Sequence, residues 1–177
     1  MAKTQKIIIT AAVTGATHTP SLSPYFPATP DQIIADAVTA HAAGAAVVHV
    51  HARNPEDSKP TPDIGIMTDI VSSIKRQCDA VVCITTGGSL MMSKEQRLAP
   101  VVQLKPELAS CNAGSVNFVF ADLATKLKNP KFDWEVSYLQ GTYDLIFSNT
   151  FAGMEYYIDT MNQYDIRPEF EVYDVGM

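Results

Sequence analysis

Short runs of β-branched residues alternate along the chain with longer stretches whose apolar residues recur at helical spacing. The runs predict five strands, at residues 6–12, 46–51, 81–85, 108–112 and 169–173. Capping signals and spacing predict a helix that opens at Thr29-Pro30 and ends at Gly44, and a shorter one that begins after Ser93. Further helices are predicted over about 63–77 and 151–164. Repeated strand–helix–strand order indicates an α/β fold with parallel strands and helical crossovers.

Two parallel architectures fit this order: an open doubly wound sheet and a (β/α)₈ barrel. The first run, residues 6–12, is so apolar that it predicts a strand buried on both faces. The 177 residues end soon after the fifth strand. An open sheet of five strands would be complete there, whereas a barrel typically needs about 250 residues. Length alone therefore favours the open sheet.

Composition places the chain among compact proteins. Hydrophobic residues make up 46% of it, enough for one domain over residues 1–177 with a sizeable core. With 13 basic and 19 acidic side chains the net charge is −6, which argues against binding to nucleic acid or to an anionic membrane. No apolar run approaches the roughly 20 residues of a membrane span. Three cysteines do not make a disulfide framework, so we expect a cytoplasmic protein.

The clearest chemical signal is His49-Val50-His51 in the second predicted strand. Residues two apart on a strand point to the same face, and both histidines lie near the carboxyl end of the strand, where parallel folds build their sites. Two neutral imidazoles suit Zn²⁺, although Co, Ni, Cu and Fe also accept them and a catalytic zinc usually takes three protein ligands. In the alternative interpretation one histidine packs in the core and the other binds a carbonyl group.

Other candidates lie at the ends of the later strands. The turn that runs from Thr85 to Ser89 combines glycines, hydroxyls and free amides, and can hold a carboxylate or a phosphate, or can be an ordinary turn. Ser110 is near the end of the fourth strand, and Glu169 and Glu171 share one face of the fifth. A buried carboxylate is costly unless it is paired or bound to a metal, whereas an exposed edge strand would make both glutamates ordinary. The cysteines are predicted to pack as small apolar residues.

Several short motifs occur in an order typical of one family. They include Ile9-Thr-Ala-Ala-Val-Thr-Gly-Ala16, His49-Val-His51-Ala-Arg53, Thr85-Thr-Gly-Gly88, Asn112-Ala-Gly114 and Pro168-Glu-Phe-Glu-Val-Tyr173. Together they resemble the β-keto acid cleavage enzymes, whose type member is the 3-keto-5-aminohexanoate cleavage enzyme of lysine fermentation. The resemblance covers nearly the whole chain. It implies a (β/α)₈ barrel and a homo-oligomer, with this chain supplying only about the first five strands, and so reverses the conclusion from length.

The same resemblance implies a reaction and a set of roles. A β-keto acid would react with acetyl-CoA to give acetoacetate and a new CoA thioester, with one zinc ion and no organic cofactor. His49 and His51 would bind the zinc together with a glutamate that has no counterpart in these residues. Thr85 and Gly88 would line the keto-acid pocket, and Ser110 would help to hold the carboxylate. Glu171 would orient a ligand or relay a proton near the metal.

Two departures from the family pattern change the expectations. The type member has a glutamate, which contacts the substrate's amino group, where this chain has Thr17. A neutral residue there implies a substrate without that ammonium group. The arginine and aspartate that assist catalysis in the family also have no counterpart here, so these 177 residues alone are not expected to turn over a substrate. The alternative is a non-catalytic half-barrel, with exposed edge strands, that binds a metal or assembles with a partner chain.

Overall fold

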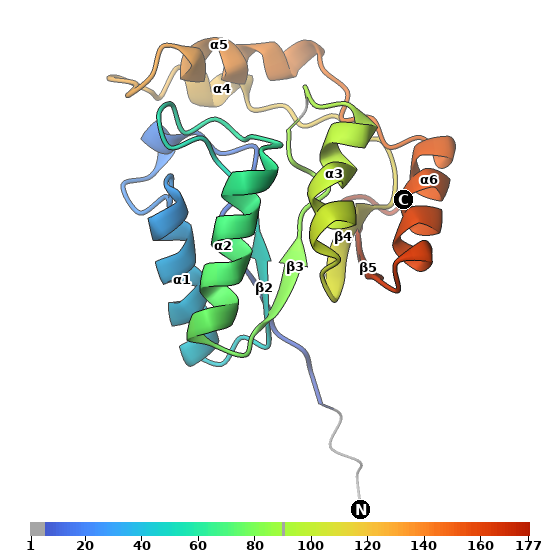
Figure 1. The fold of residues 1–177 in the computed structure, drawn as a ribbon. Coiled ribbons are helices and arrows are strands. Elements are labelled where there is room, and N and C mark those ends of the chain that lie inside the picture. Colours follow the sequence, from blue (N-terminus) through green and yellow to red (C-terminus); the bar gives the residue numbers. More distant parts are fainter. Residues whose placement is uncertain (1–5, 90) are drawn as a thin grey trace, which may run out of the picture.

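The protein folds around one curled, fully parallel sheet (Figure 1). A computed structural model describes residues 6–89 and 91–177. The strands are β1 (Thr10–Ala12), β2 (Val47–Val50), β3 (Val81–Ile84), β4 (Leu108–Asn112) and β5 (Arg167–Glu171), and they pair in the order β1-β2-β3-β4-β5. The five predicted strands are therefore present, with the last one shifted by two residues toward the N-terminus.

The crossover helices show which parallel architecture this is. They are α1 (Pro30–Ala42), α2 (Ile64–Gln77), α3 (Lys94–Leu104) and α6 (Phe151–Gln163). They stand in one row, in which α1 contacts α2, α2 contacts α3 and α3 contacts α6 (Figure 1). A doubly wound sheet reverses its strand order at a switch point and carries helices on both faces. Sequential order with one row of helices is the arrangement of a (β/α)₈ barrel, of which these residues form about half.

Local capping chemistry explains where the helices begin and end. The Thr29 side chain accepts a hydrogen bond from the Gln32 amide while the Gln32 side chain accepts one from the Thr29 amide, and Ser93 and Gln96 repeat this capping box at α3. Gly44 follows α1 with a φ of +112°, a conformation that other residues rarely adopt. These predicted boundaries are confirmed.

The two faces of the sheet differ in chemistry. Val48, Val50, Val82 and Ile84 point outward into the apolar core beneath the helices. His49 pairs in register with Cys83, and farther along the sheet Ser110 pairs with Glu169 and Asn112 with Glu171. Since residues in register point to the same side of a sheet, the inner face is polar and carries the candidate site.

The first strand differs from its prediction. Pairing with β2 begins only at Thr10, so β1 has three residues in place of seven. Ile7, Ile8 and Ile9 are 85%, 73% and 58% exposed, and the prediction that they are buried on both faces is wrong. Their apolar character favours a strand, but β1 lies at the sheet edge and, in the described part of the chain, no other segment covers these three side chains.

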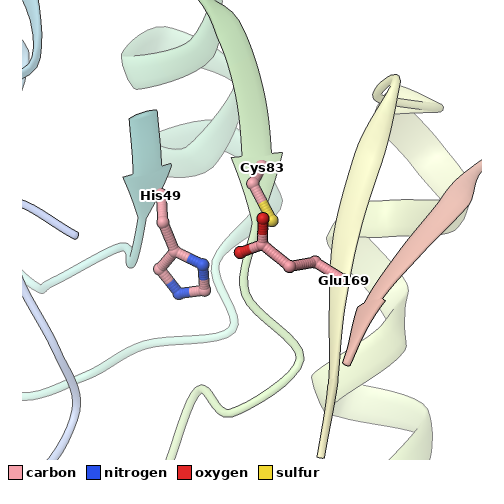
Figure 2. Close-up of side chains that lie close together, drawn as sticks. All are labelled: His49, Cys83 and Glu169. Carbon is pink, nitrogen blue, oxygen red and sulfur yellow. The ribbon is translucent and has the colours of Figure 1, made fainter. Parts of the chain in front are cut away.

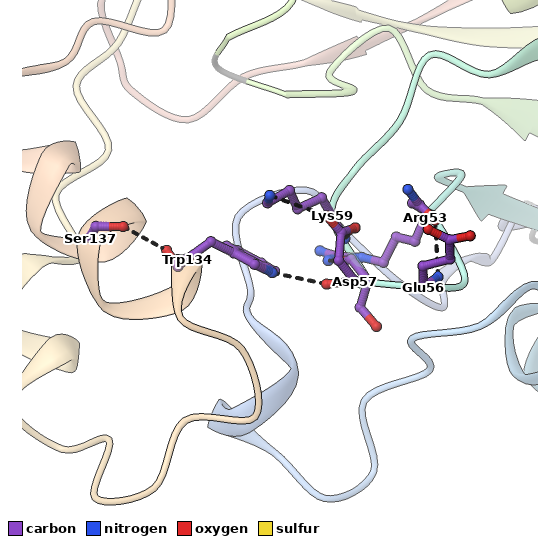
Figure 3. A network of polar contacts seen from close by, with 8 residues as sticks. Arg53, Glu56, Asp57, Lys59, Trp134 and Ser137 are labelled. Atoms are coloured by element: carbon purple, nitrogen blue, oxygen red, sulfur yellow. Dashed lines mark hydrogen bonds and ion pairs between the residues drawn. The ribbon is translucent and has the colours of Figure 1, made fainter.

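The irregular stretch between β4 and α6 lies across the carboxyl ends of the strands (Figure 1). It contains the short helices α4 (Ala121–Ala124) and α5 (Trp134–Gly141), and the 3₁₀ turn η2 (Thr142–Asp144). Trp134 donates from Nε1 to the carbonyl oxygen of Asp57 at 2.9 Å, which ties α5 to the loop after β2 (Figure 3). Within residues 6–89 and 91–177 no helix is both long enough and apolar enough to cross a membrane.

A buried carboxylate ties the stretch between β4 and α6 to the loop after β1. Glu135, at the start of α5, is fully buried, and its carboxylate accepts hydrogen bonds from the Ser21 amide at 2.8 Å and the Ser21 hydroxyl at 2.7 Å. The Phe132 amide donates a third, at 3.1 Å. Ser21 belongs to the 3₁₀ turn η1 (Pro20–Leu22) in the loop after β1. The carboxylate therefore connects segments more than 100 residues apart.

Candidate metal and substrate site

The two predicted histidines lie together at the end of β2. His49 is on the strand and His51 just beyond it, their Nε2 atoms are 3.1 Å apart, and both side chains are buried. Burial lowers the pKa of His49 to about 4. Burial also lowers the pKa of His51, with a further contribution from the charges of His49 and Arg53. Both imidazoles are therefore neutral at physiological pH, the form that binds a metal ion.

Two more potential ligands approach His49 from neighbouring strands. The thiol of Cys83 on β3 and the carboxylate of Glu169 on β5 point toward the His49 ring (Figure 2). The three potential ligand atoms all lie within 4.8 Å of one another. Burial, followed by the charges of Glu169 and Glu171, raises the pKa of the Cys83 thiol. Nitrogen, sulfur and oxygen donors of this kind suit zinc and related ions.

The fifth strand supplies two acidic groups with different environments. Burial raises the pKa of Glu171, and the Tyr173 hydroxyl donates to its Oε2 at 3.2 Å. Glu169 accepts a hydrogen bond of 3.2 Å from the Thr10 hydroxyl on β1. Because β1 and β5 are the two edges of the sheet, this bond shows how strongly the sheet curls.

These groups surround one cavity of about 390 Å³. The predicted site residues Thr17, Thr85, Glu171, His49 and His51 all line it. Its wall is completed by glycines, by Asn112 and by a cluster of aromatic side chains: Phe118, Phe120, Phe147 and Tyr173. No lysine or arginine occurs among the described residues that line this cavity, although two glutamates do. Uncompensated carboxylates favour the entry of a cation.

The other two predicted site residues lie outside this wall. Ser110 is fully buried, and its hydroxyl oxygen accepts a hydrogen bond of 3.0 Å from the Thr86 amide. Gly88 faces Met92, since a Cβ at that glycine would lie 2.9 Å from the Met92 sulfur. The roles assigned to Ser110 and Gly88 by resemblance stay predictions.

The turn after β3 was expected to offer free backbone amides, but three of its amides are hydrogen-bonded within the protein. The Thr85 amide donates to the carbonyl oxygen of Val50, the Thr86 amide to Ser110, and the Gly87 amide to the Thr85 hydroxyl at 2.8 Å. The prediction that this turn offers free amides is therefore wrong for these three residues. The Thr85 hydroxyl, having accepted that bond, keeps its own hydrogen for a ligand.

A residue that the sequence reasoning left out is Asn112. It lies at the end of β4, is 1% exposed and lines the cavity, where its side chain partly offsets the rise that burial gives to the pKa of the neighbouring Glu171. Neither its amide nitrogen nor its amide oxygen has a partner within 3.5 Å. Nδ1 of His51 is unpartnered in the same way. Buried polar groups are nearly always hydrogen-bonded in native proteins, so these atoms indicate a place for a ligand.

Arg53 anchors the loop after β1, whose residues 14–17 line the cavity. Its guanidinium is fully buried and donates to the carbonyl oxygens of Gly15, His18 and Ser58. Phe26 stacks against it, with the ring centroid 4.5 Å from Cζ. The loop that carries Thr17 is therefore anchored to the residues that follow β2, where Figure 3 shows the Arg53 side chain.

Comparison with known proteins agrees with this arrangement. The family model described as beta-keto acid cleavage enzyme matches residues 6–177. The chain belongs to this family. The 3,5-dioxohexanoate:acetyl-CoA acetone transferase of Paraburkholderia graminis is 46% identical over 99% of the chain and 57% of that protein. The 3-keto-5-aminohexanoate cleavage enzyme of Acetoanaerobium sticklandii is 35% identical over 98% of the chain and 55% of that protein.

The chain spans a little more than half the length of these relatives. Among solved structures, one titled as the ternary complex of ObcA with a C4-CoA adduct and oxalate has a TM-score of 0.61 at 21% identity. It matches 87% of this chain and 32% of that chain. This likeness supports the fold alone.

Proposed function

We propose that this chain carries the metal and keto-acid half of a zinc-dependent β-keto acid cleavage enzyme, whose reaction with acetyl-CoA gives acetoacetate and a CoA thioester. The observation that carries the proposal is the pair of neutral, buried histidines facing two glutamates inside one cavity of a family member. The relatives named above are transferases for acetyl-CoA or cleavage enzymes for keto acids, which supports the substrate class.

The residues present fit a metal ion. His49 and His51 would hold it, and the unpartnered Nδ1 of His51 together with the acidic lining favours a bound cation. Cys83 and Glu169 are the further donors near His49, while the family resemblance places a third ligand in a glutamate that these residues do not contain. Bound zinc would act as a Lewis acid on the substrate's keto oxygen.

The chain's own residues then have separate tasks. Glu171, whose pKa is raised by burial, would accept and return the proton that moves when the carbon–carbon bond is exchanged. The Tyr173 hydroxyl orients that carboxylate. The Thr85 hydroxyl donates toward the substrate, and the aromatic wall excludes water from the tail of the substrate.

The wall around Thr17 supports a substrate with an uncharged tail. Thr17 offers a hydroxyl where an ammonium group would need a carboxylate, and the aromatic side chains of the wall are neutral. The 46%-identical relative is named for 3,5-dioxohexanoate, a keto acid with a second carbonyl in place of an amine. We therefore propose 3,5-dioxohexanoate or a closely similar neutral-tailed keto acid as the substrate.

Metal content and ligand preference test the proposal. Metal analysis of the purified chain should find about one zinc, which is lost in the double variant His49→Ala/His51→Ala. Isothermal titration should show tighter binding of 3,5-dioxohexanoate than of 3-keto-5-aminohexanoate. Thr17→Glu should reverse this preference, and Thr17→Val, a neutral variant of the same shape, should keep it. A protein without zinc, or one that prefers the amino acid, would contradict the proposal.

We further propose that residues 1–177 form one domain, the N-terminal part of the barrel, in a cytoplasmic homo-oligomer. The three cysteines, all without a disulfide, are consistent with a reducing compartment. The alternative is a non-catalytic half-barrel that binds a metal or assembles with a partner chain. Light scattering after size exclusion, combined with mass spectrometry of the subunits, separates the two. Copies of a single chain would support the homo-oligomer, whereas a complex with a second, complementary polypeptide would favour the alternative.

A further inference from the structure

We infer that Arg97 is a positioning residue, whose buried side chain sets the aromatic wall of the cavity and thereby the preference of the protein for the tail of its substrate. The inference rests on the proposed function, since it assumes a keto acid whose tail lies against that wall. Arg97 belongs to the first turn of α3 and does not line the cavity itself. It acts through Phe147, whose ring does.

The guanidinium of Arg97 is buried without an acidic partner. The residue is 6% exposed, and in the part of the chain that the structure describes no carboxylate forms an ion pair with it. Burial lowers the pKa of Arg97, because a charge is costly in this place, although an arginine stays protonated there. Directional hydrogen bonds from such a charge favour one geometry of its neighbours, and its contacts support this role.

Three acceptors from two separate segments surround this guanidinium. Nη1 donates to the carbonyl oxygen of Ser148 at 3.0 Å and Nη2 to Oδ1 of Asn149 at 2.7 Å, both in the segment just before α6. Nε donates to the carbonyl oxygen of Thr86, in the turn after β3. A lysine could not hold all three, because its amine is a single charge on a flexible stem whereas the guanidinium is a rigid fork. Arg97 therefore fixes the turn after β3 and the segment before α6 relative to each other.

The same guanidinium contacts two aromatic rings. Its Cζ lies 4.5 Å from the centroid of the Phe147 ring and 5.3 Å from that of the Tyr157 ring. Contact with aromatic rings stabilises a desolvated guanidinium. Tyr157 belongs to α6 and packs in the core, whereas the Phe147 ring reaches the cavity. The position of the Phe147 ring is therefore tied to a charge that lies outside the cavity.

Phe147 in turn holds the rest of the aromatic wall. Its backbone pairs with that of Val116 through two hydrogen bonds of 2.8 and 3.1 Å. Beside this pair, Nδ2 of Asn149 donates to the carbonyl oxygen of Gly114 at 3.1 Å. The ring centroid of Phe118 lies 5.9 Å from that of Phe147, and both rings line the cavity. Loss of the guanidinium contacts should therefore loosen both segments that carry the wall.

Two keto acids that differ only in their tails measure this effect. 3-Oxohexanoate has the head group of acetoacetate and two additional carbons, and burial of each CH₂ group is worth about fourfold in affinity. The unaltered zinc-loaded protein should therefore bind 3-oxohexanoate about 10-fold more tightly than acetoacetate. Arg97→Lys keeps the charge but loses the fork, so this preference should fall to about threefold or less while the affinity for zinc stays the same.

Two control variants separate this role from a general effect on the fold. Arg76→Lys makes the same exchange at an exposed position of α2 and should keep the preference for 3-oxohexanoate. Thr29→Ala removes the cap of α1 and weakens the fold without touching the wall, so it should keep the preference as well. A merely structural role of Arg97 would lower stability in the same way and leave the preference unchanged.

Hydrogen exchange tests the positioning without any ligand. The amides of Val116 and Phe147 each donate to the carbonyl group of the other residue. In Arg97→Lys both amides should exchange about 10-fold faster than in the unaltered protein, because local opening of the wall becomes easier. The amide of Ile33, at the capped start of α1, should exchange at the same rate in both proteins.

NMR of the unaltered protein provides the second test if Arg97→Lys does not fold. 3-Oxohexanoate should slow the exchange of the Arg97 Nε hydrogen and of the Phe147 amide, and acetoacetate should not. Equal slowing by both keto acids, or unchanged preference and exchange in Arg97→Lys, would overturn the inference while leaving the proposed function intact. Failure of the unaltered zinc-loaded protein to bind either keto acid would overturn both.

Discussion

The depressed pKa of His49 predicts a specific acid sensitivity of the metal-free protein. The pKa is about 4 in the folded state and 6.5 in an exposed histidine. Between these values the unfolded chain takes up a proton that the folded protein does not, so stability falls as the pH drops below 6.5. The difference of about 2.5 pH units corresponds to about 3 kcal/mol in total, and linkage places about 2 kcal/mol of it between pH 7 and pH 5.

Urea unfolding in the presence of a chelator measures this loss. The free energy of unfolding of the wild-type protein and of His49→Gln is compared at pH 7 and pH 5, which cancels the titration of carboxylates common to both proteins. With a urea dependence of about 2 kcal/mol per molar, the wild-type midpoint should fall by about 1 M more than that of the variant. His51, whose pKa is also lowered by burial, adds to the same trend in both proteins. Equal losses would refute the burial argument for His49.

Three further predictions follow from single contacts. Glu135→Ala should lower the free energy of unfolding by about 3 kcal/mol, because three donors lose one buried acceptor. As a control, Glu155→Ala at an exposed position of α6 should change it by less than about 0.5 kcal/mol. Thr29→Ala should cost about 1 kcal/mol by removing the cap of α1, measured by the same urea method, with retention of wild-type stability speaking against the capping box. Zinc should raise the melting temperature reversibly against a chelator in the wild-type protein but not in His51→Ala; an equal rise in both would exclude His51 as a ligand.

Local signals predict the helices and most of the strands well. The boundaries of α1 and α3 depend on hydrogen bonds between residues three apart, such as Thr29 with Gln32, so a short stretch of sequence contains all the information. The strand at residues 6–12 shows the limit of this reasoning. Its apolar residues favour extended structure, but burial depends on which other segments cover it, and Ile7 is 85% exposed.

The sequence predicts the arrangement of site residues that belong to one strand, but not of those that come together from different strands. Two-residue periodicity places His49 and His51 on one face, and the structure confirms it. The positions of Cys83 and Asn112 cannot be predicted in this way. The approach of Cys83 to His49, and of Asn112 to the cavity, depends on the register between strands, which no local pattern fixes. The prediction of free amides in the turn after β3 fails for a related reason. The Thr85 and Thr86 amides donate to Val50 and Ser110, which belong to neighbouring strands.

The features that weaken the fold gather on the inner face of the sheet. Asn112 and His51 have unpartnered polar atoms there, burial suppresses the charge of His49, and Glu171 is held in surroundings that raise its pKa. On the outer face, among the described residues, only the Tyr157 hydroxyl has a comparable defect. Local destabilisation of this kind is typical of binding sites, where a ligand completes the missing interactions. A bound cation and a carboxylate would satisfy these groups together, which is why we expect zinc and keto acid each to strengthen the binding of the other.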